Sequence, residues 1–256
     1  MDINVEVIYS ESVALTSGGL YPMLISYASS GSYQYSGSVP CALGFTGYLY
    51  GSRDLPVFVT AWHCFGFVGT DRASPYSIRF MVNGYTLDTN SGAFFNPGPY
   101  SWGSYLWSPI LYVDSDAAFI GKADPALFDK VGVRHGYVIK ADGSRDLPIV
   151  GQLQKYDVKV GDTLYARLGR SYTTVSGKVT SLCTGGGVTS PSSSFWVVIR
   201  CHTEVDISPY SFQGGDGGSP VYRLLSDGVF AYGVLTGRLG QPNLMWVGTL
   251  DWITLN

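Results

Sequence analysis

Short apolar runs recur along the chain and are separated by clusters of Gly, Ser, Pro, Asn and Asp. Examples are "LPVFVTAWHC", "YSIRFMVN", "FWVVIRCHTEV" and "GVFAYGVLTG". About ten such runs, bounded by turn residues, predict an all-β sandwich or a pair of barrels. No window keeps a helical period beyond roughly two or three turns. The best helical candidates are residues 124–132 and the C-terminal segment "MWVGTLDWITLN".

A repeated heptad suggests two similar halves. "GSRDLPV" at residues 51–57 recurs as "GSRDLPI" at residues 143–149, and each copy leads into a predicted strand. A reused hairpin turn would explain the repeat equally well. By contrast, residues 89–109 are rich in aromatic residues, Pro and Gly, and are predicted to form a long loop.

The composition supports a folded β-rich domain. The chain has 256 residues, of which 45% are hydrophobic and only 14% charged, with 33 Gly and 19 Tyr. The net charge is -3 and no basic run exists, so there is no electrostatic reason to expect nucleic acid as a partner. No apolar window is long enough for a membrane span. The acidic N-terminal segment does not read as a signal peptide, and the sequence does not indicate an oligomeric state.

The cysteines narrow the chemistry further. The chain has 4 of them, Cys41, Cys64, Cys183 and Cys201, and no C-x-x-C pair. This pattern argues against zinc and permits two disulfides in an oxidising compartment. Four buried free thiols are the alternative.

The chain has only 3 histidines, His63, His135 and His202, so a catalytic base has few candidates. His63 ends an apolar run in "VTAWHC", whereas His135 is expected in a solvated turn and His202 in a polar strand. In "VDSDAAFI", Asp116 directly precedes an apolar strand, where a carboxylate becomes buried and can hold an imidazole. Asp114 is expected to cap a turn.

The stretch "GGDGGSPV" contains the other candidate chemistry. Gly214 and Gly215 let the backbone turn amides inward, and Gly218 lets the chain turn away. Two such amides can form an oxyanion hole. Taken alone, the stretch would be only a glycine-rich turn.

Together, "TAWHC", "DAAFI" and "GDGGSPV" follow one another in an order that resembles the chymotrypsin-like serine proteases. "CALGFTGY", "FVTAWHC" and "LGRSYTTVSGKVTSL" resemble the bacterial, streptogrisin-like branch. The resemblance covers roughly residues 39–236. It implies two six-stranded antiparallel β-barrels and a C-terminal helix. The expected parts are an N-terminal arm over residues 1–35, a first barrel over 36–130 and a second barrel over 131–256 with the Gly214–Ser219 loop.

The resemblance also implies a role for each residue of the site. His63 would be the general base and Asp116 would orient it. The amides of Gly215 and Gly217 would form the oxyanion hole, and Asp216 would form a buried ion pair.

Disulfides and a substrate cleft complete what the resemblance implies. Cys41 would pair with Cys64, and Cys183 with Cys201. Four residues are expected to line the substrate cleft: Ser211, Thr236, Gly237 and Arg238. Neither a metal nor a cofactor is needed for this chemistry.

The chain departs from the family at the nucleophile, because Gly217 stands where the family has serine. Ser219 lies about 6 to 7 Å farther along an extended backbone, which is too far to replace it. Trp62 and Gln213 also differ from the family pattern. If the chain is a natural pseudoprotease, Trp62 or the loop at residues 89–109 is expected to obstruct the cleft.

Two functions follow from these residues. The first is a secreted trypsin-like endopeptidase scaffold, inactive here because position 217 is Gly, by engineering or by natural loss. The second is a natural pseudoprotease that acts as a binding or structural module outside the cell or on a virion. The partner in either case is a peptide or protein. A lectin-like β-sandwich is a third and weaker alternative.

Overall fold

The computed structural model describes residues 3–6, 22–29, 32–35, 41–49, 52–65, 77–82, 85–88, 93–97, 100–106, 108–122, 136–138, 147–171, 173–189, 196–237, 241–251 and 253–255. Within these ranges the regular structure is β-strand, apart from the short 3-10 helices η1 (Trp62–Phe65) and η3 (Lys155–Asp157). The prediction of an all-β fold is confirmed.

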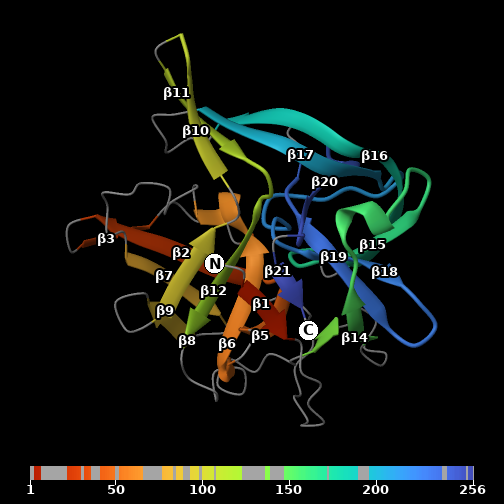
Figure 1. Cartoon of the computed structure of the whole chain (residues 1–256), viewed down its shortest axis with the longest axis horizontal. Coiled ribbons are helices and arrows are strands. Elements are labelled where there is room, and N and C mark those ends of the chain that lie inside the picture. The colour runs from red at the N-terminus through yellow and green to blue at the C-terminus, as the bar shows by residue number, and fades with distance from the viewer. Residues whose placement is uncertain are drawn as a thin grey trace.

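The first of two bodies combines a six-stranded and a five-stranded sheet and lies on the left of Figure 1. The six-stranded sheet has the order β21 (Ile253–Leu255), β1 (Ile3–Glu6), β5 (Phe45–Leu49), β6 (Ser52–Ala61), β12 (Ala117–Lys122), β9 (Ala93–Pro97). The five-stranded sheet has the order β3 (Ser32–Tyr35), β2 (Pro22–Ser29), β7 (Ser77–Val82), β8 (Tyr85–Asp88), with β4 (Cys41–Ala42) paired to β2.

The second body is a ten-stranded sheet that curves over the right of Figure 1. Its order is β10 (Tyr100–Tyr105), β11 (Ser108–Val113), β17 (Trp196–Asp206), β16 (Thr173–Thr189), β15 (Thr163–Leu168), β18 (Pro220–Leu224), β19 (Val229–Leu235), β14 (Leu147–Gln152), β13 (Tyr137–Val138), with β20 (Leu244–Thr249) paired to β17 and β19. The β10–β11 hairpin supplies two of the ten strands, pairs with β17 and projects from the molecule.

The predicted C-terminal helix is wrong. β20 pairs antiparallel with β17 and β19, and β21 pairs in parallel with β1. Residues 245–250 are all buried, so both faces of this segment need apolar partners. A strand inside a sheet buries both faces, whereas a surface helix buries one.

The remaining expectations about the fold have different outcomes. Residues 89–109 do not form one long loop, because they contain β9 and β10. Each copy of the heptad leads into a strand, β6 and β14, as predicted. The helical candidate at residues 124–132 lies outside the described residues. The N-terminal arm and the barrel boundaries stay predictions, although β1 pairs with β5 in the six-stranded sheet.

One apolar core joins the two bodies. Its buried members include Phe45, Val59 and Phe119 from the first body, together with Val229 and Val234 from the second. Burying such side chains contributes roughly 1.5–3 kcal/mol each. The two bodies are therefore fixed against each other, and residues from both can form one site.

Candidate active site

The pairing of β6 with β12 brings His63 and Asp116 together. The two strands run antiparallel with Ala61 opposite Ala117. His63 follows Ala61 by two residues in η1, and Asp116 precedes Ala117 by one. The two residues therefore lie next to each other, at the same end of two neighbouring strands.

The Asp116 carboxylate holds His63 at two points. The His63 backbone N–H donates to Oδ1 at 2.8 Å, and the ring Nδ1 lies 2.5 Å from Oδ2. The Asp116 side chain is fully buried, whereas 27% of the His63 side chain is exposed. Burial lowers the pKa of His63, but the charge of Asp116 and the hydrogen bond to it outweigh burial and raise this pKa above 6.5.

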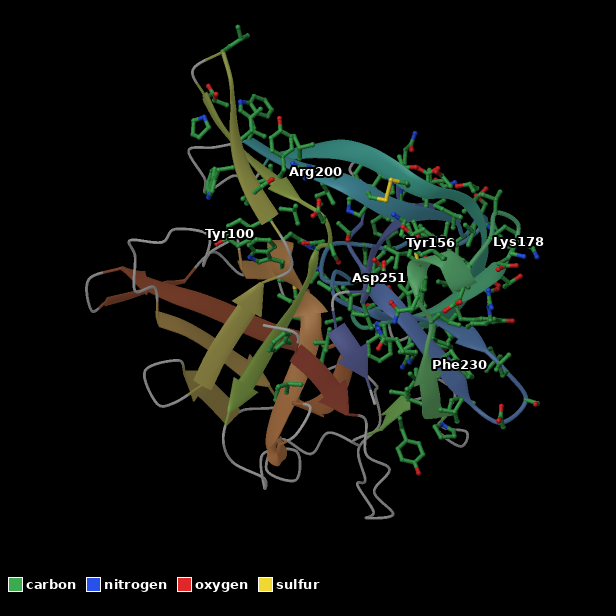
Figure 2. All side chains as sticks on the ribbon, in the orientation of Figure 1. Tyr100, Tyr156, Lys178, Arg200, Phe230 and Asp251 are labelled. Carbon is green, nitrogen blue, oxygen red and sulfur yellow. A yellow bond between two sulfur atoms is a disulfide. The ribbon has the colours of Figure 1, made fainter. Side chains whose placement is uncertain are left out.

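Ser115 and Trp62 support this pair, and sequence reasoning did not assign them that role. The buried Ser115 hydroxyl donates to the Thr249 carbonyl at 2.6 Å, which fixes the turn before β12 to β20. The Trp62 backbone N–H donates to the Asp116 carbonyl at 2.5 Å. The Trp62 ring is fully buried and packs 5.4 Å from the Tyr100 ring. Tyr100 is the first residue of β10, at the base of the projecting β10–β11 hairpin (Figure 2).

The glycine-rich loop at residues 214–219 needs glycine at two positions. Gly215 and Gly218 have φ values of 102° and 88°, in the left-handed region. A Cβ on Gly218 would lie 2.3 Å from the Ala42 carbonyl oxygen. The Gly217 carbonyl accepts from the Ala42 N–H at 2.7 Å, so the loop is fixed against the first body.

Asp216 anchors the loop from inside. Its buried carboxylate accepts hydrogen bonds from the backbone N–H groups of Arg170 at 2.8 Å, Ser171 at 3.2 Å and Gln213 at 2.9 Å. The Ser171 hydroxyl donates a further bond at 2.8 Å. Among the described residues, these bonds stand in place of the expected ion pair, and they satisfy the buried charge.

Gly217 lies directly below the imidazole of His63. A Cβ built on Gly217 would lie 2.6 Å from His63 Nε2 and 3.0 Å from Cε1. The next nearest atom is Cys41 Sγ at 3.9 Å. Nε2, the ring nitrogen that Asp116 does not hold, therefore faces the position where the family has its nucleophile.

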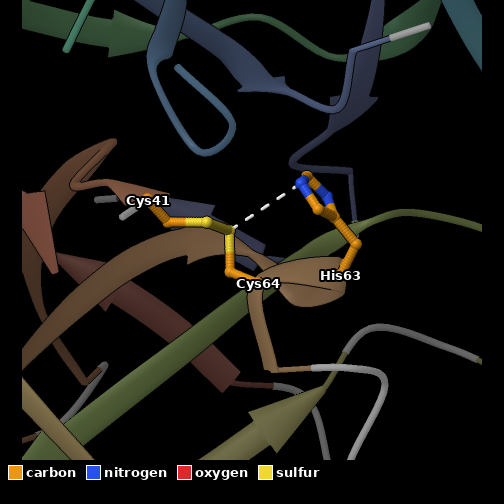
Figure 3. A group of neighbouring side chains, drawn as sticks. All are labelled: Cys41, His63 and Cys64. Atoms are coloured by element: carbon orange, nitrogen blue, oxygen red, sulfur yellow. Dashed lines mark hydrogen bonds between the residues drawn. A yellow bond between two sulfur atoms is a disulfide. The ribbon is translucent and has the colours of Figure 1, made fainter. Parts of the chain in front are cut away.

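The predicted disulfides, Cys41–Cys64 and Cys183–Cys201, are both present, and the described residues contain no free cysteine. Figure 3 shows the first disulfide beside the His63 ring, with Cys64 Sγ 3.9 Å from Nε2.

The side chains of Cys41, His63 and Cys64 are close enough together to surround a metal ion. However, both sulfurs are in a disulfide, and a thiolate is the form of cysteine that binds metals. The cluster is therefore not a metal site.

The residues expected to line the cleft differ in exposure and in backbone conformation. Ser211 is exposed, Thr236 is half-buried with no hydrogen-bond partner for its hydroxyl among the described residues, and Gly237 has a φ of 86°. A Cβ on Gly237 would lie 3.2 Å from the ring of Phe212. Arg238 lies outside the described residues.

Ser219 is not placed to act as a nucleophile. Its side chain is fully buried, and its hydroxyl oxygen accepts a hydrogen bond from the Gly169 N–H at 3.0 Å. A nucleophilic hydroxyl must instead reach a base at about 3 Å. The structure therefore agrees with the prediction that Ser219 does not replace the missing serine.

The other candidate groups lie apart from the pair. Asp114 is exposed and forms an ion pair with Arg200 at 3.4 Å. His202 is fully buried and stacks on Trp246 with ring centroids 4.7 Å apart. Burial lowers the pKa of His202 to about 4, although the charge of Asp116 and the backbone of Thr184 oppose this effect. His135 lies outside the described residues.

No protein-family model and no curated protein matches the chain. Among solved structures, an inactive mutant of the murine norovirus NS6 protease is 14% identical, with 81% of this chain and 89% of that chain covered and a TM-score of 0.38. The active form of the Rv3671c protease from M. tuberculosis is 12% identical, with 94% and 88% covered and a TM-score of 0.40. A mutant of human heparin binding protein is 15% identical, with 93% and 92% covered and a TM-score of 0.37. Similarities at this level do not assign the chain to a family.

Proposed function

We propose that the chain is a chymotrypsin-like serine protease scaffold that binds peptides and does not cleave them. The observation that carries the proposal is the position of His63, which is held by Asp116 and directs Nε2 at Gly217. In a Ser-His-Asp mechanism the imidazole takes a proton from a serine hydroxyl at this position. Glycine has no hydroxyl, so no acyl-enzyme can form.

The loop that would hold the oxyanion supports the same proposal. Asp216, Gly218 and Ser219 use their backbone N–H groups within the fold, bonding to Gln213, Leu235 and Asp216. Among the described residues no backbone acceptor is recorded for the amides of Gly215 and Gly217. These two donors are the ones proposed to bind a peptide carbonyl.

Replacement of the missing side chain tests the proposal. We expect Gly217→Ser to react with a serine-directed fluorophosphonate and to cleave an unfolded protein, and the parent chain to do neither. A serine Cβ would lie 2.6 Å from Nε2 with the ring in its present place, so His63 must shift by several tenths of an ångström. The double variant Gly217→Ser/His63→Ala is the matched control and should stay unlabelled. Labelling of the parent chain would contradict the proposal.

A natural pseudoprotease remains the second candidate. The close approach of the imidazole to Gly217 favours it, because this ring position suits glycine better than serine. The burial of Trp62 counts against this candidate, because a buried ring does not obstruct the cleft. A revertant that folds, with His63 and Asp116 in place, and is still inactive would support this second candidate.

The proposed location is extracellular. Two disulfides are typical of oxidising compartments. Among the described residues, the structure has no helix with the length and apolar character of a membrane span. The proposed partner is an extended peptide or protein segment.

A further inference from the structure

His63 has one ring nitrogen free to act as a base. Asp116 holds Nδ1 and thereby the proton on it, which leaves the lone pair on Nε2. Among the described residues, the polar atom that Nε2 contacts is a disulfide sulfur, Cys64 Sγ, 3.9 Å away. That atom is a weak acceptor at a long distance and does not compete for Nε2.

The close approach of Nε2 to Gly217 leaves no room for a side-chain carbon with the ring in its present place. A Cβ on Gly217 would lie 2.6 Å from Nε2, which is too close for a non-bonded contact between a carbon and a ring nitrogen. A hydrogen bond between a nitrogen and an oxygen spans roughly 2.7–3.2 Å. A water molecule is not covalently bonded to Gly217, so it can lie farther from the Cα of Gly217 and still donate a hydrogen bond to Nε2.

Two amides of the same loop are the donors that we assign to the carbonyl oxygen. The N–H groups of Gly215 and Gly217 have no recorded backbone acceptor among the described residues. Asp216, between them, fixes the loop through its four hydrogen bonds. A general base and preorganised donors can each accelerate acyl transfer without a covalent intermediate.

We propose that this site hydrolyses activated esters by direct attack of water, an activity that rests on the proposed protease-like site without a nucleophile. Water attacks the ester carbonyl carbon while His63 Nε2 removes one of its protons. The carbonyl π electrons move to the oxygen, which the two amides bind. The intermediate then collapses and the bond to the leaving oxygen breaks. The leaving group either takes the proton from His63 or departs as a phenolate, in which case His63 releases its proton to the solvent. The products are a free carboxylic acid and an alcohol, and no acyl-enzyme forms.

The substrate class follows from the missing nucleophile. A free water molecule is less well positioned than a serine hydroxyl, so the reaction needs an ester with a good leaving group. Peptide amides have much poorer leaving groups and should not react. The activity thus differs from that of a serine protease in both mechanism and substrate.

The test is hydrolysis of p-nitrophenyl acetate by the full chain. We expect linear release of p-nitrophenol with no initial burst, and a rate that rises with pH as one imidazole loses its proton. His63→Gln and Asp116→Asn should each lower the rate, His63→Gln by roughly 10²-fold or more. His135→Ala is the matched control, because the sequence places this histidine outside the predicted site, and it should leave the rate unchanged.

The outcomes separate this inference from the proposed function. A burst equal to the enzyme concentration, or a rate unchanged in both His63→Gln and Asp116→Asn, would overturn direct hydrolysis. If peptide binding persists in that case, the peptide-binding scaffold stands without the esterase activity. If peptide binding and ester hydrolysis are both absent from a folded chain, both proposals are wrong. Far-ultraviolet circular dichroism and intact disulfides establish that each variant has folded.

Discussion

Replacement of His202 by phenylalanine should make the protein less sensitive to acid. His202 is fully buried between the strands of the second body, where its ring stacks on Trp246. Its pKa is about 4 in the folded chain, against a usual value of 6.5, chiefly because burial disfavours the charged ring. In the unfolded chain the same ring is solvated and takes up its proton near pH 6.5.

The sign and size of the effect follow from this difference. Above pH 6.5 the ring is neutral in both states and has no effect on the pH dependence. As the pH falls from 6.5 to about 4, the unfolded chain binds a proton that the folded chain does not, so the free energy of unfolding falls. At 1.36 kcal/mol per pH unit, the total loss is about 3 kcal/mol. Below pH 4 the loss no longer grows.

Phenylalanine keeps the ring and its stacking on Trp246 but cannot titrate. It also removes two buried ring nitrogens that lack a hydrogen bond of good geometry among the described residues, although the Thr184 backbone interacts with the ring. We therefore expect His202→Phe to be more stable than the parent at pH 7 by about 1 kcal/mol or more. Its advantage should grow by about 3 kcal/mol at pH 4.

Urea unfolding, followed by tryptophan fluorescence at several pH values, measures both effects. The carboxylates are the same in the two proteins, so their contribution cancels in the difference. Parallel stability curves from pH 7 to pH 4 would refute the reasoning, because His202 would then titrate equally in both states. A less stable variant at pH 7 would show that the ring nitrogens are satisfied.

Three further predictions concern the site and its supports. Asp216→Asn should lower the free energy of unfolding by about 2 kcal/mol or more, because the carboxylate accepts four hydrogen bonds; an unchanged urea midpoint would contradict this. Gly218→Ala should lower the free energy of unfolding by about 2 to 5 kcal/mol, because of the positive φ and the clash with Ala42. Gly214→Ala, whose Cβ would meet nothing within 4 Å, is the control and should not change the free energy of unfolding in the same denaturation assay. Removal of either disulfide by paired Cys→Ala changes should lower stability by about 3 kcal/mol, since the bonds close 23 and 18 residues; a loss below 1 kcal/mol in thermal unfolding would reject the chain-entropy explanation.

The sequence by itself predicted the type of secondary structure and the residues of the candidate site. Alternating apolar runs and turn residues predicted strands, and strands are what the described residues form. The motif order identified His63, Asp116 and Gly217, and the structure brings these three together. Each lies in a short motif that resembles the corresponding motif of the family, so nearby sequence carried the signal.

The tertiary structure decided what depends on residues far apart in the chain. The C-terminal segment is a strand because β1, at the other end of the chain, pairs with β21, and no local pattern reports such a partner. Asp216 is anchored by the backbone of Arg170 and Ser171 rather than by a charged side chain, and backbone donors have no sequence signature. His202 looked like a polar strand residue but is buried, because β20 packs Trp246 onto it. The 2.6 Å between Nε2 and the Cβ position of Gly217 depends on the packing of the two bodies, which bring His63 and Gly217 together from distant parts of the chain.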